Sequence, residues 1–235
     1  MDEEVDQALK IELAEYFSAF VTARRRKRIE RVLQNRTRHL TVVLEEVYQP
    51  HNTSAVLRSC ECFGVQDAHI IESGNTGRIN PDVDVGASRW LTLTRYGDPG
   101  ADNARACMSA LRARGYRLVA TTPHGAAGSL EDLEVECRTA LVFGAEESGL
   151  TRSILEEADE TATIPMYGFT ESFNVSVSAA LVLRELVRKV RRSGAAWRLT
   201  EEEKLDLRLH WYKNTVRGAE FLEKQFLSAR GVISK

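Results

Sequence analysis

The sequence lacks several features that would direct it to a membrane or to a metal. It contains no apolar run approaching the roughly 20 residues that span a bilayer. Its acidic N-terminus does not resemble a signal peptide, so we expect a cytoplasmic protein. The four cysteines form no Cys-x-x-Cys pair and the five histidines are scattered. We therefore expect free thiols and no metal site.

The common nucleotide-binding motifs are also missing. No Gly-x-Gly-x-x-Gly follows an apolar strand, which argues against an ordinary dinucleotide site and against the common open-sheet methyltransferases. Gly144 and Gly149 have the spacing of P-loop glycines, but Leu150 and Thr151 stand where that loop has its phosphate-binding lysine. No Ser-His-Asp or Cys-His set stands out.

What the sequence does contain is an alternation of strand and helix patterns. The 235 residues are 43% hydrophobic and 28% charged, which suits a soluble protein with one good-sized core plus appendages, or with two small domains. We predict an α/β domain with a largely parallel sheet over residues 38–193. Its predicted strands cover residues 40–48, 68–72, 91–94, 117–122, 139–143 and 161–165. Between the first two strands, Asn52 is placed to cap a helix and Gly64 to end it.

Helical segments are predicted on both sides of this domain. Residues 1–37 form a helical, basic extension that we expect to bind RNA. Residues 194–235 form a second helical extension, in which Thr200 and Glu203 make a capping box at the start of one long helix over 200–229. The apolar stripe of this helix must pack against the sheet domain, the N-terminal helices or a second copy of the chain.

Positive charge is concentrated locally, although the net charge is only −2. Residues 24–38 carry eight Arg and Lys residues against the single acid Glu30, a plausible footprint for nucleic-acid phosphates. A solvated helix face is the alternative for this cluster, and an equally good one for a second cluster on 184–198. The first cluster includes Arg24, Arg25, Arg26, Lys27, Arg28 and Arg31; the second includes Arg184, Arg188, Lys189, Arg191, Arg192 and Arg198.

Residues 164–180 are the most informative segment of the chain. A short apolar run stops at Pro165, and a helix rich in small residues opens at Ser172–Asn174 after a loop. Ser and Asn cap the free N–H groups of a helix start, and small residues let another molecule approach the backbone. The segment fits a backbone-lined ligand pocket, and it fits a well-capped buried helix equally well.

Two further segments carry candidate functional residues. In the helix that follows Asn52, Arg58 lies on the flank of the apolar face and can reach sideways. The strand at 139–143 empties into an acidic, glycine-bounded turn with Glu146, at the end of a strand where α/β proteins bind ligands. The alternative is that neither residue has a catalytic role. Arg58 would then be an ordinary exposed arginine, and the negative charge of Glu146 would stabilise the N-terminus of the next helix.

Together, these three segments resemble the SpoU/TrmH family of RNA ribose 2′-O-methyltransferases, within the SPOUT superfamily. The resemblance consists of Asn52 six residues before Arg58 in a helix ending Phe-Gly-Val, a strand leading into Gly-Ala-Glu146, and Ile-Pro-Met followed by Ser-Phe-Asn-Val-Ser-Val. It covers about residues 24–192 and is strongest for the branch that modifies tRNA guanosine.

The resemblance implies a C-terminal deep trefoil knot in the sheet domain, a homodimer and S-adenosylmethionine as cofactor. It implies 2′-O-methylation of tRNA, with the D-loop guanosine at tRNA position 18 as target. Ribosomal RNA or another tRNA position is the alternative substrate, and a non-catalytic RNA-binding or assembly protein on the same fold is the alternative function. The implied catalytic residues are Arg58, with Asn52 and Glu146 orienting it, together with Ser172 and Asn174. The implied cofactor-binding residues are Thr121, Gly144, Ile164, Met166 and Phe173, where Phe173 replaces a leucine common in the family.

Overall fold

The computed structural model describes residues 2–72, 79–123 and 128–232, with side chains from residue 7 onward. The chain divides into two compact units. Met1–Arg36 and Arg198–Lys235 form the terminal unit, and Thr37–Trp197 form the sheet unit. The two extensions that the sequence separates thus belong to one body. Among the described residues, no helix is both long and apolar enough to cross a membrane.

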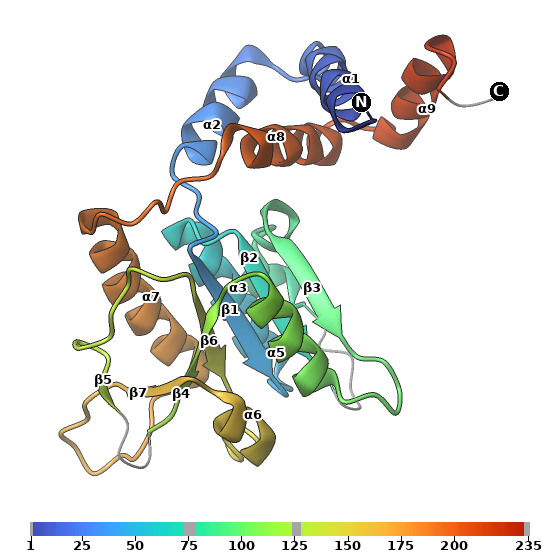
Figure 1. Cartoon of the computed structure of the whole chain (residues 1–235). Helices are drawn as coiled ribbons and strands as arrows, with labels where there is room; N and C mark the ends of the chain where they lie inside the picture. Colours follow the sequence, from blue (N-terminus) through green and yellow to red (C-terminus); the bar gives the residue numbers. More distant parts are fainter. Residues whose placement is uncertain (1, 73–78, 124–127, 233–235) are drawn as a thin grey trace. The chain divides into compact units, whose positions relative to one another are not determined.

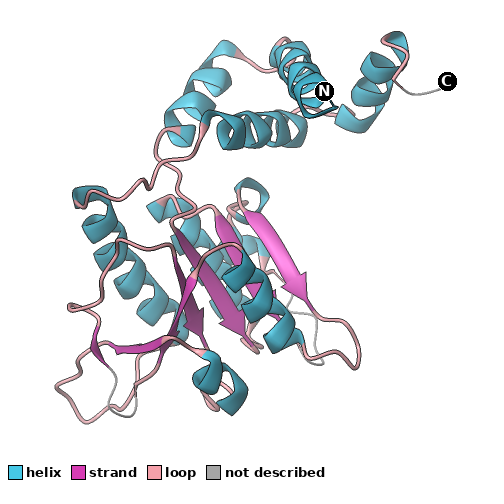
Figure 2. Ribbon diagram, viewed as in Figure 1, coloured by secondary structure: helices cyan, strands magenta, loops and turns pink. Residues whose placement is uncertain are grey.

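The described part of the sheet unit contains a seven-stranded sheet, as the strand–helix alternation predicts (Figures 1 and 2). The strand order is β3-β2-β1-β6-β4-β7-β5, and all the pairings are parallel. The strands are β1 (Leu40–Glu45), β2 (Asp67–Ile71), β3 (Thr92–Tyr96), β4 (Arg117–Thr121), β5 (Gly128–Ser129), β6 (Thr139–Phe143) and β7 (Glu160–Thr163).

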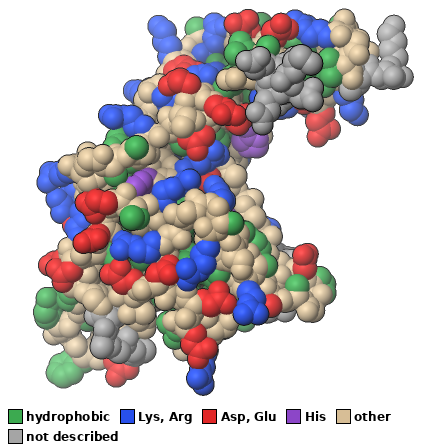
Figure 3. Space-filling model, in the orientation of Figure 1, with side chains coloured by type: hydrophobic (Ala, Val, Ile, Leu, Met, Phe, Trp, Pro, Cys, Tyr) green, Lys and Arg blue, Asp and Glu red, His purple; other side chains and the backbone are tan. Residues whose placement is uncertain are grey.

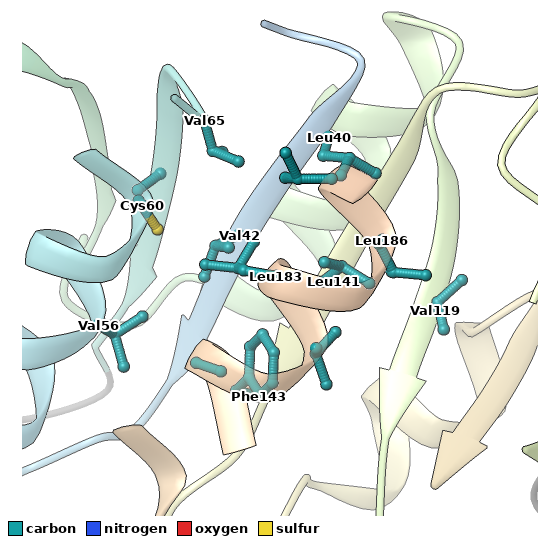
Figure 4. Close-up of a cluster of buried hydrophobic side chains, with 14 of the residues drawn as sticks. Leu40, Val42, Val56, Cys60, Val65, Val119, Leu141, Phe143, Leu183 and Leu186 are labelled. Carbon is teal, nitrogen blue, oxygen red and sulfur yellow. The ribbon is translucent and has the colours of Figure 1, made fainter. Parts of the chain in front are cut away.

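Helices cover both faces of the sheet, so its central strands are buried on both sides. Every residue of β1 and β6 is buried, as expected for near-continuous apolar strands in a parallel sheet. On one face α3 (Pro50–Phe63) and α7 (Val175–Arg192) pack against these strands, and Figure 4 shows Leu183 and Leu186 of α7 over Val42 and Leu141. Each such side chain contributes about 1.5–3 kcal/mol of transfer free energy.

The other face of the sheet carries α5 (Asn103–Ala113) and α6 (Arg152–Glu157). Cys107, Met108 and Leu111 of α5 and Ile154 of α6 form a second core with the sheet. Two short elements connect β2 to β3: α4 (Pro81–Asp84) and the 3₁₀ helix η1 (Ser88–Trp90).

The terminal unit is helical. Its elements are α1 (Asp2–Ser18), α2 (Ala23–Leu33), α8 (Glu201–Thr215) and α9 (Ala219–Ala229). Phe17, Leu33 and Trp211 are almost fully buried within it, and the Arg36 guanidinium lies 5.3 Å from the centre of the Trp211 ring. The capping box of Thr200 and Glu203 is confirmed.

The prediction of one helix over 200–229 is wrong. The chain becomes extended at Val216, and Gly218 adopts a left-handed conformation with φ of 73° before α9 begins. A residue without Cβ takes this conformation at little cost, so a second helix starts in a new direction. The apolar stripe that runs past this point therefore belongs to two helices.

Candidate active site

A cleft lies where β4, β6 and β7 end, at the carboxyl edge of the parallel sheet. Ligands bind at this edge in open α/β sheets because the loops that follow the strands converge there. A cavity of about 80 Å³ adjoins a wider cleft of about 820 Å³. The two share Thr121, Thr122, Pro123, Ser172, Phe173 and Ser178 as lining residues.

The five residues expected to bind the cofactor all line this combined space. Thr121 and Phe173 border both parts, Ile164 and Met166 border the smaller cavity, and Gly144 borders the wider cleft. They come from the ends of β4 and β6, from the loop after β7 and from the residues just before α7. Leu130 and Val182, which the sequence does not single out, add apolar walls to the smaller cavity.

Gly144 is required for the shape of the loop that follows β6. A Cβ atom at this position would lie 2.3 Å from the carbonyl carbon of Gly149 and 2.5 Å from the amide nitrogen of Leu150. The loop folds back on itself here, with Gly149 donating a hydrogen bond to the Ala145 carbonyl at 2.9 Å. The glycine therefore serves a close approach of backbone to backbone beside the cleft.

The loop between β7 and α7 offers its backbone to a ligand. Within the described chain, the peptide groups of residues 164–173 make no hydrogen bond to one another or to other residues. Most of these residues are exposed, so their backbone groups are accessible for pairing with a ligand. Apolar side chains and unpaired backbone groups around one cavity fit S-adenosylmethionine, which has an aromatic base and several polar groups.

Three candidate catalytic residues meet at the mouth of the cleft. The side-chain amide of Asn52 donates hydrogen bonds to Glu146 Oε1 and, at 3.3 Å, to Gln49 Oε1. Asn174 Nδ2 donates to Asn52 Oδ1 at 3.2 Å, and Asn174 Oδ1 caps α7 by accepting from the Ser176 N–H at 2.9 Å. This Asn52–Glu146–Asn174 cluster links α3, the loop after β6 and the start of α7.

The predicted role of Asn52 as a helix cap is wrong. Helix α3 begins at Pro50, and Gln49 is its N-cap residue. Proline suits the first helical position because it has no N–H to leave unpaired there. Asn52 is therefore inside the first turn and buried, and its side chain is available for Glu146 and Asn174. Gly64 ends the helix with φ of 83°, as predicted.

The structure does not bring Arg58 to Asn52 and Glu146. Six residues along an α-helix correspond to about 120° around its axis, so Arg58 projects from a different side of α3 than Asn52. Its side chain is exposed and, among the described residues, makes no hydrogen bond or ion pair. In the described chain, therefore, neither Asn52 nor Glu146 makes a hydrogen bond to Arg58, and their role in orienting it stays a prediction. Ser172 lines both parts of the cleft and is exposed.

A buried carboxylate that the sequence analysis missed, that of Glu45, is bound to the loop that follows β6. Glu45, the last residue of β1, accepts hydrogen bonds from the Thr151 N–H at 2.8 Å and the Thr151 hydroxyl at 2.7 Å. Burial raises the pKa of Glu45, and the bonds from Thr151 partly offset this rise. Glu45 thereby fixes the end of the 144–151 loop, whose other end carries Glu146. The only sign of this role in the sequence is an acidic residue at the end of an apolar strand.

The predicted RNA-binding side chains lie mostly on the surface. Arg24, Arg25, Lys27, Arg28 and Arg31 of α2 are exposed, whereas Arg26 is half-buried and donates to the Ser18 carbonyl. Glu30 is held by Arg208 of α8 through bonds of 2.6 and 2.8 Å.

On α7, Arg184 and Arg191 are exposed, with the Arg191 guanidinium 5.3 Å from the centre of the Trp197 ring. Figure 3 shows basic and acidic side chains interspersed over the visible face, consistent with the small net charge. In the part of the chain that the structure describes, no group of acidic, His and Cys side chains could hold a metal ion.

Comparisons with known proteins agree with this geometry. Residues 39–184 match the model of the SpoU rRNA methylase family. A tRNA (guanosine(18)-2'-O)-methyltransferase of Borreliella burgdorferi is 40% identical over 206 residues, covering 88% of this chain and 92% of that protein. The crystal structure of the Aquifex aeolicus TrmH/SpoU tRNA modifying enzyme superposes with a TM-score of 0.73 at 29% identity, covering 83% of this chain and 98% of that one.

The SpoU methyltransferase AviRb of Streptomyces viridochromogenes, solved in complex with AdoMet, has a TM-score of 0.54 at 26% identity, covering 70% of this chain and 62% of that one. The family model spans the strands that build the cleft and both asparagines of the Asn52–Glu146–Asn174 cluster. The chain is a member of the SpoU methylase family.

Proposed function

We propose that this protein transfers a methyl group from S-adenosylmethionine to the ribose 2′-hydroxyl of guanosine 18 in the D-loop of tRNA. Family membership supports the methyl transfer, and 40% identity to a tRNA (guanosine(18)-2'-O)-methyltransferase over most of both chains supports the substrate. The observation that carries the proposal is the Asn52–Glu146–Asn174 cluster, in which three distant segments converge beside the cleft.

The cleft accounts for cofactor binding through the residues that line it. Ile164, Met166 and Phe173 would pack on the apolar parts of S-adenosylmethionine, and the unpaired backbone of residues 164–173 would bind its polar groups. When bound, this cofactor supplies a methyl group activated by attachment to a sulfonium. The protein's task is then to align the acceptor oxygen with that methyl group, which provides much of the rate.

Arg58 is the residue best suited to stabilise the acceptor oxygen as it loses its proton. A guanidinium stays protonated in proteins, so Arg58 does not act as the base. It stabilises the developing alkoxide and holds the adjacent phosphate, which helps to take the proton. Ser172 and Asn174 contact the ribose or its phosphate. Asn52 and Glu146 keep the start of α3 and the loop after β6 in register with Asn174.

A homodimer would explain why Arg58 lies apart from the cluster. Val177 and Leu181 lie one turn apart on α7 with side chains 44% and 39% exposed, and Phe173, just before this helix, is 43% exposed. A second copy that covers these side chains would let Arg58 of one protomer complete the cleft of the other.

Mixed dimers test this arrangement. Co-expression of an Arg58→Ala chain with an Asn174→Asp chain gives a dimer in which one site regains both residues if Arg58 acts across the interface. Activity in this mixture well above that of either variant alone is the expected result. Inactive mixed dimers of normal mass would place Arg58 and Asn174 in the same chain's site.

We also infer a knotted path for the end of the sheet unit. The chain leaves β7, close to one edge of the sheet, and returns to pack α7 against α3 and Asn174 against Asn52. In this proposal the segment passes through the loop before β6, which would close the trefoil. Exposed cations on α2 support tRNA binding through phosphates, which provides affinity without sequence choice. With tRNA as substrate, we place the protein in the cytoplasm.

A methyl-transfer assay with labelled S-adenosylmethionine tests the function directly. Unmodified tRNA, the same tRNA with guanosine 18 replaced, and ribosomal RNA are offered separately, and the modified nucleotide is mapped. We expect 2′-O-methylguanosine at position 18 and no label in the substituted tRNA. If the label appears only in ribosomal RNA or at another tRNA position, that nucleotide is the substrate in place of guanosine 18. Cofactor and RNA binding without transfer would favour a non-catalytic protein.

A further inference from the structure

Leu130, in the segment from Gly128 to Glu136, forms part of the wall of the smaller cavity. Side chains of α7, of β4 and of the residue before β1 hold this segment in place. On its inner side β5 pairs with β7, and the Leu130 N–H donates to the Thr163 carbonyl at 3.0 Å. The Leu130 side chain is 6% exposed and lines the cavity. We call residues 128–136 the strap.

The outer carbonyls of the strap are bound by basic side chains. Lys189 Nζ donates to the carbonyls of Glu131, of Leu133 at 3.2 Å and of Leu130 at 3.5 Å. Further along, an Arg117 guanidinium nitrogen lies 2.5 Å from the Glu134 carbonyl, and His39 Nε2 lies 2.6 Å from the Val135 carbonyl. The strap has only the two-residue strand β5 of its own, so these contacts act together with the pairing to β7 in holding Leu130.

Lys189 makes the contacts that bear most directly on the cavity. It lies seven residues after Val182, which is two turns of α7, so both side chains lie on the same side of the helix. Val182 lines the cavity together with Leu130, and Lys189 binds the strap at and beside Leu130. One helix thus supplies one apolar wall and fastens the other.

These contacts change the interpretation of Lys189. In the sequence it belongs to a basic cluster that suggests phosphate binding, but all three donors of its ammonium group are directed to backbone carbonyls. The neighbouring Arg188 is exposed and, among the described residues, pairs only with Glu185 one turn away. Among these side chains, Arg188 and not Lys189 has the environment of a surface cation.

We propose that Lys189 is a positioning residue for cofactor binding: it fastens the strap so that Leu130 closes the wall of the cavity against the bound cofactor. The proposal rests on the proposed function, because it concerns the site of S-adenosylmethionine. It assigns Lys189 to the affinity for the cofactor and not to the affinity for RNA.

Titration of purified variants with S-adenosylmethionine in a calorimeter, and with tRNA in a filter-binding assay, tests the proposal. Lys189→Met keeps the length of the side chain but removes its donors. We expect it to raise the Kd and KM for S-adenosylmethionine about tenfold, the order that hydrogen bonds from a charged donor contribute. At saturating cofactor, kcat and the Kd for tRNA should stay within about twofold of wild type.

Three further variants separate the hydrogen bonds of Lys189 to the strap from the effect of its charge. Arg188→Met removes a positive charge one residue away and should leave the cofactor Kd unchanged, whereas Lys189→Arg keeps the donors and should restore most of the affinity. Leu130→Ala shortens the apolar side chain that lines the cavity but keeps the backbone carbonyls that Lys189 binds. It should weaken cofactor binding as Lys189→Met does. Hydrogen exchange should show faster exchange in residues 128–136 of Lys189→Met alone.

Each outcome of this experiment decides one claim. If wild-type protein does not bind S-adenosylmethionine, the proposed function fails before the variants are compared. If wild type binds S-adenosylmethionine and Lys189→Met or Leu130→Ala binds it equally well, only the proposed role of Lys189 in holding the strap is overturned. A Lys189→Met protein that loses tRNA affinity while keeping cofactor affinity would return Lys189 to the RNA-binding surface.

Discussion

Asn174 donates a hydrogen bond to Asn52 over 3.2 Å, although 122 residues of sequence separate the two side chains. The bond joins the first turn of α3 to the residue that caps α7, and Asn52 passes the connection on to Glu146. Asn52 donates to Glu146 and accepts from Asn174. Asn174 donates to Asn52 and accepts from the Ser176 N–H at the start of α7. The two helices that cover one face of the sheet therefore share a polar junction beside the cleft.

Substitution of Asn174 should separate its two roles. Aspartate is also a good N-cap, so Asn174→Asp should keep the thermal stability of the protein but lose the donor to Asn52, lowering kcat by about tenfold or more. Asn174→Ala should lose the cap as well, at about 1 kcal/mol of unfolding free energy. Thermal melting and single-turnover methyl transfer distinguish the variants. An active Asn174→Asp enzyme would show that the junction is structural only.

Arg58→Lys should be nearly as inactive as Arg58→Ala, because an ammonium cannot reproduce the planar, two-pronged guanidinium. We expect both variants to lower kcat by about 100-fold, the order lost with one donor to a developing oxyanion. Because Arg58 is exposed and has no partner in the described chain, their unfolding free energy should change by less than about 0.5 kcal/mol. Near-normal turnover of Arg58→Lys would contradict this role.

Gly144→Ala should disrupt the loop after β6. The new Cβ would meet the backbone of Gly149 and Leu150 at 2.3–2.5 Å, and backbone cannot move aside as a flexible side chain can. We expect a loss of about 1–3 kcal/mol of unfolding free energy, together with weaker cofactor binding. Gly194→Ala is the matched control, since a Cβ there meets nothing within 4 Å. Equal melting temperatures for the two variants would rule out the steric argument.

His69 should make the protein sensitive to acid. Burial in β2 lowers its pKa from 6.5 to about 4, and neither ring nitrogen has a hydrogen-bond partner among the described residues. A lowered histidine pKa means that the unfolded chain takes up the proton first. Stability is therefore full above pH 6.5 and falls as the pH is lowered towards about 4.

His69→Leu should remove this contribution, and at pH 4 it should be more stable than wild type by up to about 3 kcal/mol. Urea unfolding of both proteins between pH 4 and pH 8 measures the difference. Parallel curves across that range would show that His69 does not titrate on unfolding.

Neutralising α2 should weaken tRNA binding at low salt more than at high salt. In a Lys27→Gln, Arg28→Gln double variant, the slope of log Kd against log salt should become shallower by about one for each phosphate contact that is lost. Arg105→Gln on α5, whose side chain is 73% exposed, is the control for loss of surface charge. An unchanged slope in the double variant would assign tRNA binding to another surface.

Local patterns predicted most of the elements and the members of the site. The buried strands, Gly64 as a helix end and the capping box at Thr200 follow from signals contained in a few neighbouring residues, and all are confirmed. The five expected cofactor-binding residues line one cleft because the ends of parallel strands share an edge.

What could not be predicted depends on contacts between distant segments. Asparagine is typical of helix caps, but the helix already begins at Pro50. The side chain of Asn52 is therefore available for a hydrogen bond to Glu146. Lys189 looks like a phosphate-binding cation until its carbonyl partners on the strap are known. Gly218 sits within a continuous apolar stripe, and only its backbone conformation shows that the stripe turns a corner.

The position of β6 has a consequence for how the chain is made. This strand lies between β1 and β4, with Thr139 aligned to both Leu40 and Arg117, so the middle of the sheet is filled by one of the last strands to leave the ribosome. Until then, the apolar β1 carries an open edge, which is prone to pair with other chains. Assembly of the sheet must therefore wait until β6 (Thr139–Phe143) has been made, and nascent chains halted before residue 139 should depend on chaperones to remain in solution.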